Sequence, residues 1–216
     1  MPTTKKILSD QILYKINGGS PDGSDPVDER DIWKSIEQIV NGLFKLHHLD
    51  ATLNVGETIP EAAMIATYEN VAVTSFGEKS KSILPVTPIY LPKNMGIFQV
   101  YDPYYPDVPF IPLQRGQRGL LRTDELLNDT LGLISYEPKN NVIIYSRDIT
   151  TFGLTSVTME LCVLDMSTYG VNDYLPIPAD YEEQVIKELE KQFMWVTPET
   201  GIVNAYTSIN QQQPKQ

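Results

Sequence analysis

Seven prolines lie within the thirty residues from Ile83 to Pro112 and restrict what this part of the chain can form. Proline fixes its own φ angle and lacks a backbone N–H, so it interrupts long helices and the interior strands of a sheet. We therefore predict short edge strands joined by rigid, extended connectors. Such a segment favours contact with other proteins, and its aromatic side chains are those of Tyr90, Phe98, Tyr101, Tyr104, Tyr105 and Phe110.

The composition is that of a globular protein. The chain has 216 residues, 41% hydrophobic and 21% charged, enough for one folded unit with a sizeable core. Its beginning, MPTTKKIL, contains no apolar signal region, and no stretch approaches the roughly 18 apolar residues that span a bilayer. We expect neither an export signal nor a membrane contact.

The chain has a single cysteine, Cys162, which excludes an intramolecular disulfide and a cysteine-based zinc site. This fits a reducing compartment. Cys162 lies in an alternating run, residues 156–166, where we expect a small apolar side chain on one face of a strand rather than a catalytic thiol.

The net charge of −11 argues against a protein that grips nucleic-acid phosphates, because that binding depends on clustered Lys and Arg. An acidic wall repels phosphates instead and prevents DNA from sticking to it. DNA passing nearby is therefore compatible with this chain, whereas DNA held by it is not.

Three helices are predicted. The first runs from Lys5 to Asn17, with an apolar stripe at three- and four-residue spacing. The second helix has Asp25 as its N-cap and Pro26 as its first residue, and it ends near His47. The third runs over 178–193, with acidic residues in its first turn and Tyr181, Val185, Ile186 and Leu189 buried. The stripe of the first helix is Ile7, Leu8, Ile12, Leu13 and Ile16.

Between the second and third helices, apolar and polar residues alternate along the chain, and this pattern predicts strands. One strand covers 67–76 and another 96–101. A hairpin covers 133–146, with Pro138 where a tight turn prefers it and Asn140-Asn141 tolerating the turn geometry. The last strand is 156–166, with Val157, Met159, Leu161 and Val163 on one face and Thr158, Glu160 and Cys162 on the other. Short helical turns are expected at 60–63 and 123–127.

These elements predict an α+β fold, in which an N-terminal helical hairpin and a C-terminal helix pack with an antiparallel β-sheet or small barrel. We assign 1–48 to the N-terminal helical region, 49–176 to the β-rich region, 177–196 to the C-terminal helix packing on the N-terminal helices, and 197–216 to a C-terminal arm. All belong to one folded unit.

The arm is too apolar for a free tail, because it follows Trp195 and contains Ile202 and Tyr206. We expect it to dock on a neighbouring molecule. Its deletion is then predicted to preserve the fold and to weaken that association.

Residue types that carry chemistry are few. His47, His48 and Asp50 are the one group with metal-ligand types, but adjacent helical histidines point apart and the chain has no third histidine. The glycine-rich loop 18–26 lacks a phosphate-binding pattern. We predict no catalytic, cofactor-binding or metal-binding residues, no cofactor, and no enzyme. The remaining charged groups, which capping or an ordinary solvated loop explains, are Asp22 with Asp25, Glu182 with Glu183, and the basic cluster at Arg115 and Arg118.

Several stretches resemble a family of virion structural proteins of crAss-like bacteriophages, the ring or adaptor proteins of the head-to-tail connector. They are ILSDQILYKINGG, DERDIWKSIEQIVNGLF, ILPVTPIYLPKNMGIFQVYD, YEPKNNVIIYS and YLPIPADYEEQVIKELEKQF. The resemblance covers residues 7–193 and concerns layout and spacing rather than a catalytic signature.

The resemblance implies a virion protein, assembled in the cytoplasm of the bacterial host, that forms a ring of twelve copies below the portal. Its partners would be copies of itself, the portal protein and neighbouring tail rings. Genomic DNA would pass through the lumen during ejection without sequence-specific binding. Twelve copies would carry a formal charge of 12 × −11 = −132.

Two other function classes stay open. A tail- or head-associated β module could bind host-surface carbohydrate, with Tyr101, Tyr104 and Tyr105 stacking on sugars. A virion hydrolase is the weaker alternative, because no nucleophile and base, and no metal set, can be named.

Overall fold

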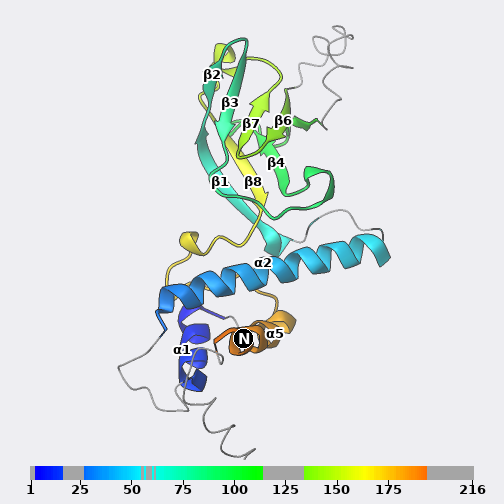
Figure 1. Cartoon of the computed structure of the whole chain (residues 1–216). Helices are drawn as coiled ribbons and strands as arrows, with labels where there is room; N and C mark the ends of the chain where they lie inside the picture. The colour runs from blue at the N-terminus through cyan, green and yellow to red at the C-terminus, as the bar shows by residue number, and fades with distance from the viewer. Residues whose placement is uncertain are drawn as a thin grey trace, which may run out of the picture. The chain divides into compact units, whose positions relative to one another are not determined.

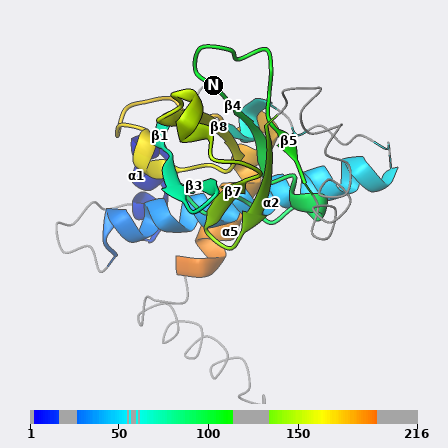
Figure 2. The same ribbon diagram turned by 90° about the horizontal axis from the view of Figure 1, so that it is seen from above.

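The computed structural model describes residues 3–16, 27–54, 56, 60, 62–113 and 134–193. The chain divides into two compact units. Unit 1 combines residues 1–46 with 165–216, and unit 2 is the intervening stretch 47–164. Figures 1 and 2 show the chain in two views. The α+β class predicted from the sequence is confirmed, with helices in unit 1 and strands in unit 2.

Unit 1 is built from helices at both ends of the chain. These are α1 (Lys5–Ile16), the part of α2 (Glu29–Asn54) that precedes residue 47, and α5 (Ala179–Phe193). Helix α5 packs against α1, and an ion pair joins Lys15 to Glu190. The ring of Phe44 lies 6.2 Å from that of Tyr181, which brings α5 against α2 as well. A short 3₁₀ helix, η4 (Met166–Thr168), belongs to the same unit.

Helix α1 confirms the predicted span, but its buried face differs from the predicted stripe. Ile7 is exposed, whereas Lys5 and Ser9 are buried beside Leu8 and Ile12. Both polar groups have partners: the Lys5 ammonium donates to carbonyl oxygens, and the Ser9 hydroxyl donates to the carbonyl of Lys5 at 2.9 Å. A polar side chain whose hydrogen bonds are all made can occupy a core position where periodicity alone predicts an apolar side chain.

Helix α2 begins later and ends later than the sequence predicts. Its N-cap is Asp28, whose carboxylate accepts a 2.9 Å hydrogen bond from the amide of Arg30. The predicted cap and first residue, Asp25 and Pro26, lie outside the described residues. The helix continues seven residues past His47 because no glycine or proline follows His47 until Gly56. The predicted boundary at 48/49 therefore falls inside α2.

Helix α5 confirms the predicted final helix. Val185 and Leu189 are buried as expected, while Tyr181 and Ile186 are only half-buried. Phe193, the last residue of α5, is buried too.

Unit 2 contains two sheets. The first has three antiparallel strands in the order β1-β8-β4, and the second has five in the order β2-β3-β7-β6-β5, antiparallel except for the parallel pair β5 and β6. A short 3₁₀ turn, η1 (Ala62–Met64), precedes the first strand, and two others, η2 (Pro92–Asn94) and η3 (Ile149–Phe152), lie between strands of the two sheets. The strands are β1 (Ile65–Ala72), β2 (Thr74–Phe76), β3 (Lys79–Ile83), β4 (Ile97–Tyr101), β5 (Ile111–Pro112), β6 (Ser135–Lys139), β7 (Val142–Tyr145) and β8 (Ser156–Cys162).

One hydrophobic core joins the two sheets of unit 2. Met159 and Leu161 of β8 contribute to it from the first sheet, and Ile143 and Tyr145 of β7 from the second. The predicted apolar face of 156–166 is confirmed, since Val157, Met159, Leu161 and Val163 all belong to this core. The opposite face of β8 is also largely covered, with Thr158 and Cys162 buried.

The prolines act as predicted. Both strands formed by the segment 83–112, β4 and β5, lie at sheet edges. The single strand predicted at 67–76 is instead two, β1 and β2, which lie in different sheets on either side of Val73. A tight hairpin at Gly77 (φ 66°) then leads into β3, which the sequence analysis did not predict.

The hairpin predicted at 133–146 is confirmed, and its turn is Asn140-Asn141 as predicted, but Pro138 lies outside the turn. Pro138 lies in β6, opposite Ile143. The strand on the other side, β5, pairs with Ser135 and Tyr136, and no described strand pairs with β6 on that side at Pro138. A proline is tolerated where the ladder is open. The short helix predicted at 123–127 lies outside the described residues, as does the arm at 197–216.

Candidate functional site

The most exposed aromatic side chain that the structure describes in unit 2, that of Tyr104, belongs to residues 102–109, which we call the aromatic loop. It follows β4, and Figure 2 shows it in green, extending beyond the strands. The side chains of Tyr104 and Tyr105 are 87% and 67% exposed, and Val108 is also exposed. Large apolar groups placed together on a protruding loop are typical of a contact surface.

Hydrogen bonds within the aromatic loop fix its backbone. The Asp102 carboxylate accepts from the amide of Tyr104 at 3.0 Å, and its carbonyl accepts from the amide of Tyr105 at 2.9 Å. The amide of Val108 donates in turn to the carbonyl of Tyr105 at 3.1 Å. Together with the fixed φ angles of Pro103, Pro106 and Pro109, these turns make the loop a rigid protrusion.

The base of the aromatic loop is anchored in the core. The amide of Phe110 donates a 2.7 Å hydrogen bond to the carbonyl of Val100, which closes the loop. The buried Phe110 ring meets Tyr145 edge to face, with centroids 6.0 Å apart. The exposed tyrosines therefore stand on a base that packing holds in place.

Tyr101 differs from its two neighbours. It is half-buried in β4, and its hydroxyl donates a 3.0 Å hydrogen bond to the carboxylate of Glu160 in β8. Burial and this bond raise the pKa of Tyr101 above its ordinary value. Of the three tyrosines that the sequence analysis offered for sugar stacking, the structure exposes Tyr104 and Tyr105 and ties Tyr101 into the sheet.

The start of the proline-rich segment encloses a pocket of about 210 Å³. The chain is held tightly there, because a Cβ added to Gly96 would lie 2.2 Å from the carbonyl oxygen of Ile89. Backbone bonds from Ile89 to Cys162 and from Cys162 to Gly96, both 2.8 Å, tie this stretch to β8. The residues lining the pocket include Leu84, Thr87, Pro88, Tyr90, Asn94 and Asn140.

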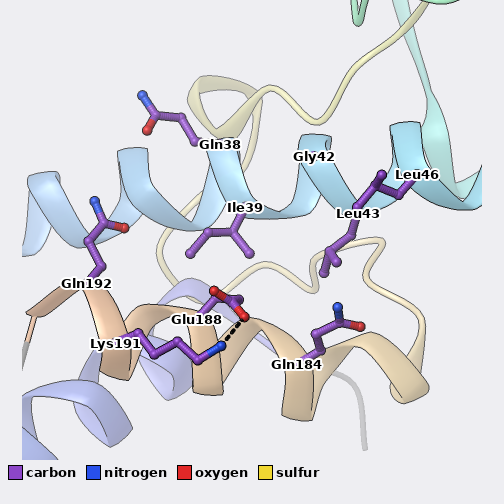
Figure 3. A pocket seen from close by; sticks show the side chains of 9 residues that line it. All are labelled: Gln38, Ile39, Gly42, Leu43, Leu46, Gln184, Glu188, Lys191 and Gln192. Atoms are coloured by element: carbon purple, nitrogen blue, oxygen red, sulfur yellow. Dashed lines mark hydrogen bonds and ion pairs between the residues drawn. The ribbon is translucent and has the colours of Figure 1, made fainter.

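Unit 1 has a groove of about 550 Å³ between α2 and α5, shown in Figure 3 and called here the α2/α5 groove. Ile39, Leu43 and Leu46 of α2 supply its apolar part. Its charged groups, Glu188 and Lys191, form an ion pair of 2.6 Å within α5. The other lining residues are Gln38, Gly42, Gln184 and Gln192.

The candidate metal ligands are not brought together. His47 is exposed and His48 buried, on successive positions of α2. Asp50 accepts a 2.6 Å hydrogen bond from the side chain of Asn54. Among the residues that the structure describes, no three His, Cys, Asp or Glu side chains are placed to hold a metal ion.

Cys162 is fully buried in β8, and burial raises the pKa of its thiol to about 12. Its Sγ–H donates to the carbonyl of Met95 at 3.4 Å. This is the environment of a packing side chain rather than of a nucleophile, because a reactive cysteine needs its thiolate form.

The remaining charged groups of the sequence analysis are at the surface or outside the described residues. Glu183 pairs with Lys187 along α5 at 2.7 Å, and this partner lowers the pKa of the carboxyl group. Asp22, Asp25, Arg115 and Arg118 lie outside the described part of the chain.

Sequence reasoning missed one buried cation. Lys5 is 5% exposed; its ammonium donates to the carbonyl oxygens of Met166 and of Tyr169, the latter at 2.6 Å, and lies 5.1 Å from the ring centre of Trp33. Nothing in the sequence indicates this role, since the carbonyl partners lie more than 160 positions away.

Searches with the sequence found no matching family model and no significantly similar curated protein. Within the described residues, no helix combines the length and apolarity that a bilayer crossing requires.

Proposed function

We propose that this protein is a structural component of a bacteriophage virion that assembles into a ring at the head-to-tail connector and forms a conduit for DNA below the portal. The family resemblance of the sequence suggests the class. The observation that carries the proposal is the aromatic loop, a rigid protrusion with Tyr104 and Tyr105 presented to solvent.

Assembly of a closed ring needs two different surfaces on each copy, one of which meets the other on the next copy. A braced loop with exposed tyrosines suits one of these surfaces, because aromatic side chains bury much area and lose little conformational entropy on binding. The proline-rich stretch beside it adds a second rigid, partly apolar area, which includes the 79% exposed Tyr90.

The acidic balance supports the conduit part of the proposal. Twelve copies carry a formal charge of 12 × −11 = −132, and a lumen lined with part of it would repel the DNA backbone. Such a wall lets DNA slide without holding it.

Mass photometry of the purified protein, with negative-stain images, tests the assembly. We expect a ring near 12 × 24.4 = 293 kDa with a central hole. Mass spectrometry of purified virions from the phage that encodes this sequence is the second measurement. A 24.4 kDa monomer that is also absent from those virions would overturn the proposal.

A second function is favoured by the same two tyrosines. Exposed neighbouring aromatic rings can stack on sugars, so a host-surface carbohydrate-binding module is the alternative. A glycan array separates the two functions: binding that is lost in Tyr104→Ala, in a protein that stays monomeric, supports the module.

A further inference from the structure

The α2/α5 groove leaves apolar surface uncovered within unit 1. Leu46 is 64% exposed and Ile39 half-buried, although both lie on the face of α2 that lines the groove. In Figure 3 the side chains of Ile39 and Leu43 point from α2 toward α5. Apolar surface gathered in a groove favours an occupant.

Gly42 lies at the middle of the groove, and no packing among the described residues requires a glycine there. A Cβ added to it would meet no atom within 4 Å, and its φ is ordinary. Replacing a mid-helix glycine with alanine is expected to favour folding about fivefold when the space is open. A glycine there leaves room for a backbone or side chain that approaches α2 closely.

A stretch of chain outside the described residues starts at one end of the groove. Gln192 lines it, and α5 ends one residue later at the buried Phe193. Twenty-three residues, 194–216, follow and lie outside the described part. A partner tethered this close has a high effective concentration at the groove, which favours it over a free molecule.

The sequence of this stretch is suited to return along the groove. Pro198 and Gly201 are turn formers and follow soon after the end of α5. The next five residues, 202–206, include Ile202, Val203 and Tyr206. In extended form they cover about 13 Å, close to the 12 Å or so between residues 38 and 46 of an α-helix.

The charges of the α2/α5 groove and of the following segment are also compatible. The groove is formally neutral, because its one cation and one anion, Lys191 and Glu188, pair with each other. Residues 194–210 contain a single charged side chain, Glu199. The side-chain amides of Gln38, Gln184 and Gln192 offer donors and acceptors to an extended backbone.

We infer that residues 202–206 dock in the α2/α5 groove of their own chain, after a turn at 197–201, with their apolar side chains against Ile39, Leu43 and Leu46. This differs from docking on a neighbouring molecule, which the sequence alone suggests. It does not depend on the proposed ring.

Disulfide trapping in the full-length protein tests the inference. The native Cys162 is buried with a raised thiol pKa, so it gives little background. Gln184→Cys on the groove is combined with Asn204→Cys or Ser208→Cys, which keep Ile202, Val203 and Tyr206. We expect mild oxidation to give an intrachain disulfide, seen as a faster band without reductant.

Glu183→Cys is the matched control, because it neighbours Gln184 on α5 but does not line the groove. Its trapped fraction should be at least fivefold lower. Equal trapping at 183 and 184, or no trapping at either, overturns the inference. Covalent dimers in a mixture of tagged and untagged protein would instead place the segment on a second copy and overturn it too.

Gly42→Ala provides an independent measurement. With the segment docked, the added methyl group takes space that the segment needs. We expect the trapped fraction to fall and the fivefold gain in the folding equilibrium to be lost. A full fivefold gain with unchanged trapping would show an empty groove.

Discussion

The hydroxyl of Tyr145 donates a 3.0 Å hydrogen bond to Oγ of Ser82, deep in unit 2, and so joins the side chains of neighbouring strands β7 and β3. Both residues are almost completely buried. Neither polar group reaches water, so each depends on the other.

Tyr145→Phe is predicted to lower the free energy of unfolding by about 1–2 kcal/mol, because it leaves the buried Ser82 hydroxyl without its donor. Urea denaturation measures the loss. Ser82→Ala and the double variant complete a double-mutant cycle. The free energy of unfolding lost in the double variant should be smaller than the sum of the losses in the two single variants. Strict additivity would contradict a direct interaction.

Stability should decrease in alkali. Burial raises the pKa of Cys162 from 9.0 to about 12, and it also raises the pKa values of Tyr136 and Tyr145 above 10.0. The unfolded chain therefore loses these protons at lower pH than the folded chain does. The free energy of unfolding should be unaffected by these groups below about pH 9 and fall above it.

Urea denaturation between pH 7 and pH 11 measures this effect, and Cys162→Ala should remove the part that begins near pH 9. A thiol-reactive dye gives a second measurement at pH 8, where Cys162 should react only after unfolding. Rapid labelling of the folded protein would contradict the buried, protonated thiol.

Lys5→Met is predicted to destabilise unit 1 by about 1–3 kcal/mol, because the carbonyl groups of Met166 and Tyr169 lose a charged donor. Lys6→Met is the matched control, since Lys6 is the exposed next residue of α1. Its effect should stay within about 0.5 kcal/mol. Equal losses in the two variants, measured by thermal or urea unfolding, would rule out a specific role of Lys5.

The double variant Tyr104→Ala, Tyr105→Ala should keep the fold and lose assembly, because both side chains are exposed and contribute little to the core. We expect an unchanged unfolding midpoint and a loss of large species in mass photometry. Tyr14→Ala, at a 60% exposed tyrosine of α1, is the control and should assemble normally. Equal assembly of all three proteins would exclude the aromatic loop as an assembly surface.

The parts of the fold that depend on local pattern were predictable. The alternation of 156–166 identified the core face of β8, and the prolines of 83–112 placed β4 and β5 at sheet edges. The exposed aromatic loop follows from the same segment. Each of these features is set by residues close together in the chain.

Features that depend on distant residues were not predictable. Pro138 is tolerated in β6 because, among the described strands, β5 ends before it, and Lys5 is buried because its ammonium donates to carbonyl groups of Met166 and Tyr169. The α2/α5 groove likewise exists only once α2 meets α5. Its central residue, Gly42, left a signal in the sequence, since a glycine inside a long helix is costly without a reason.

Unit 1 draws its helices from both ends of the chain, with the whole of unit 2 inserted between them. During synthesis, unit 2 has all of its residues once position 164 has left the ribosome, whereas α1 and the first part of α2 must wait for α5. The first helices made are thus the last to find their partner. Until residue 193 emerges, the face of α1 that packs against α5 is open to chaperones and to misassembly.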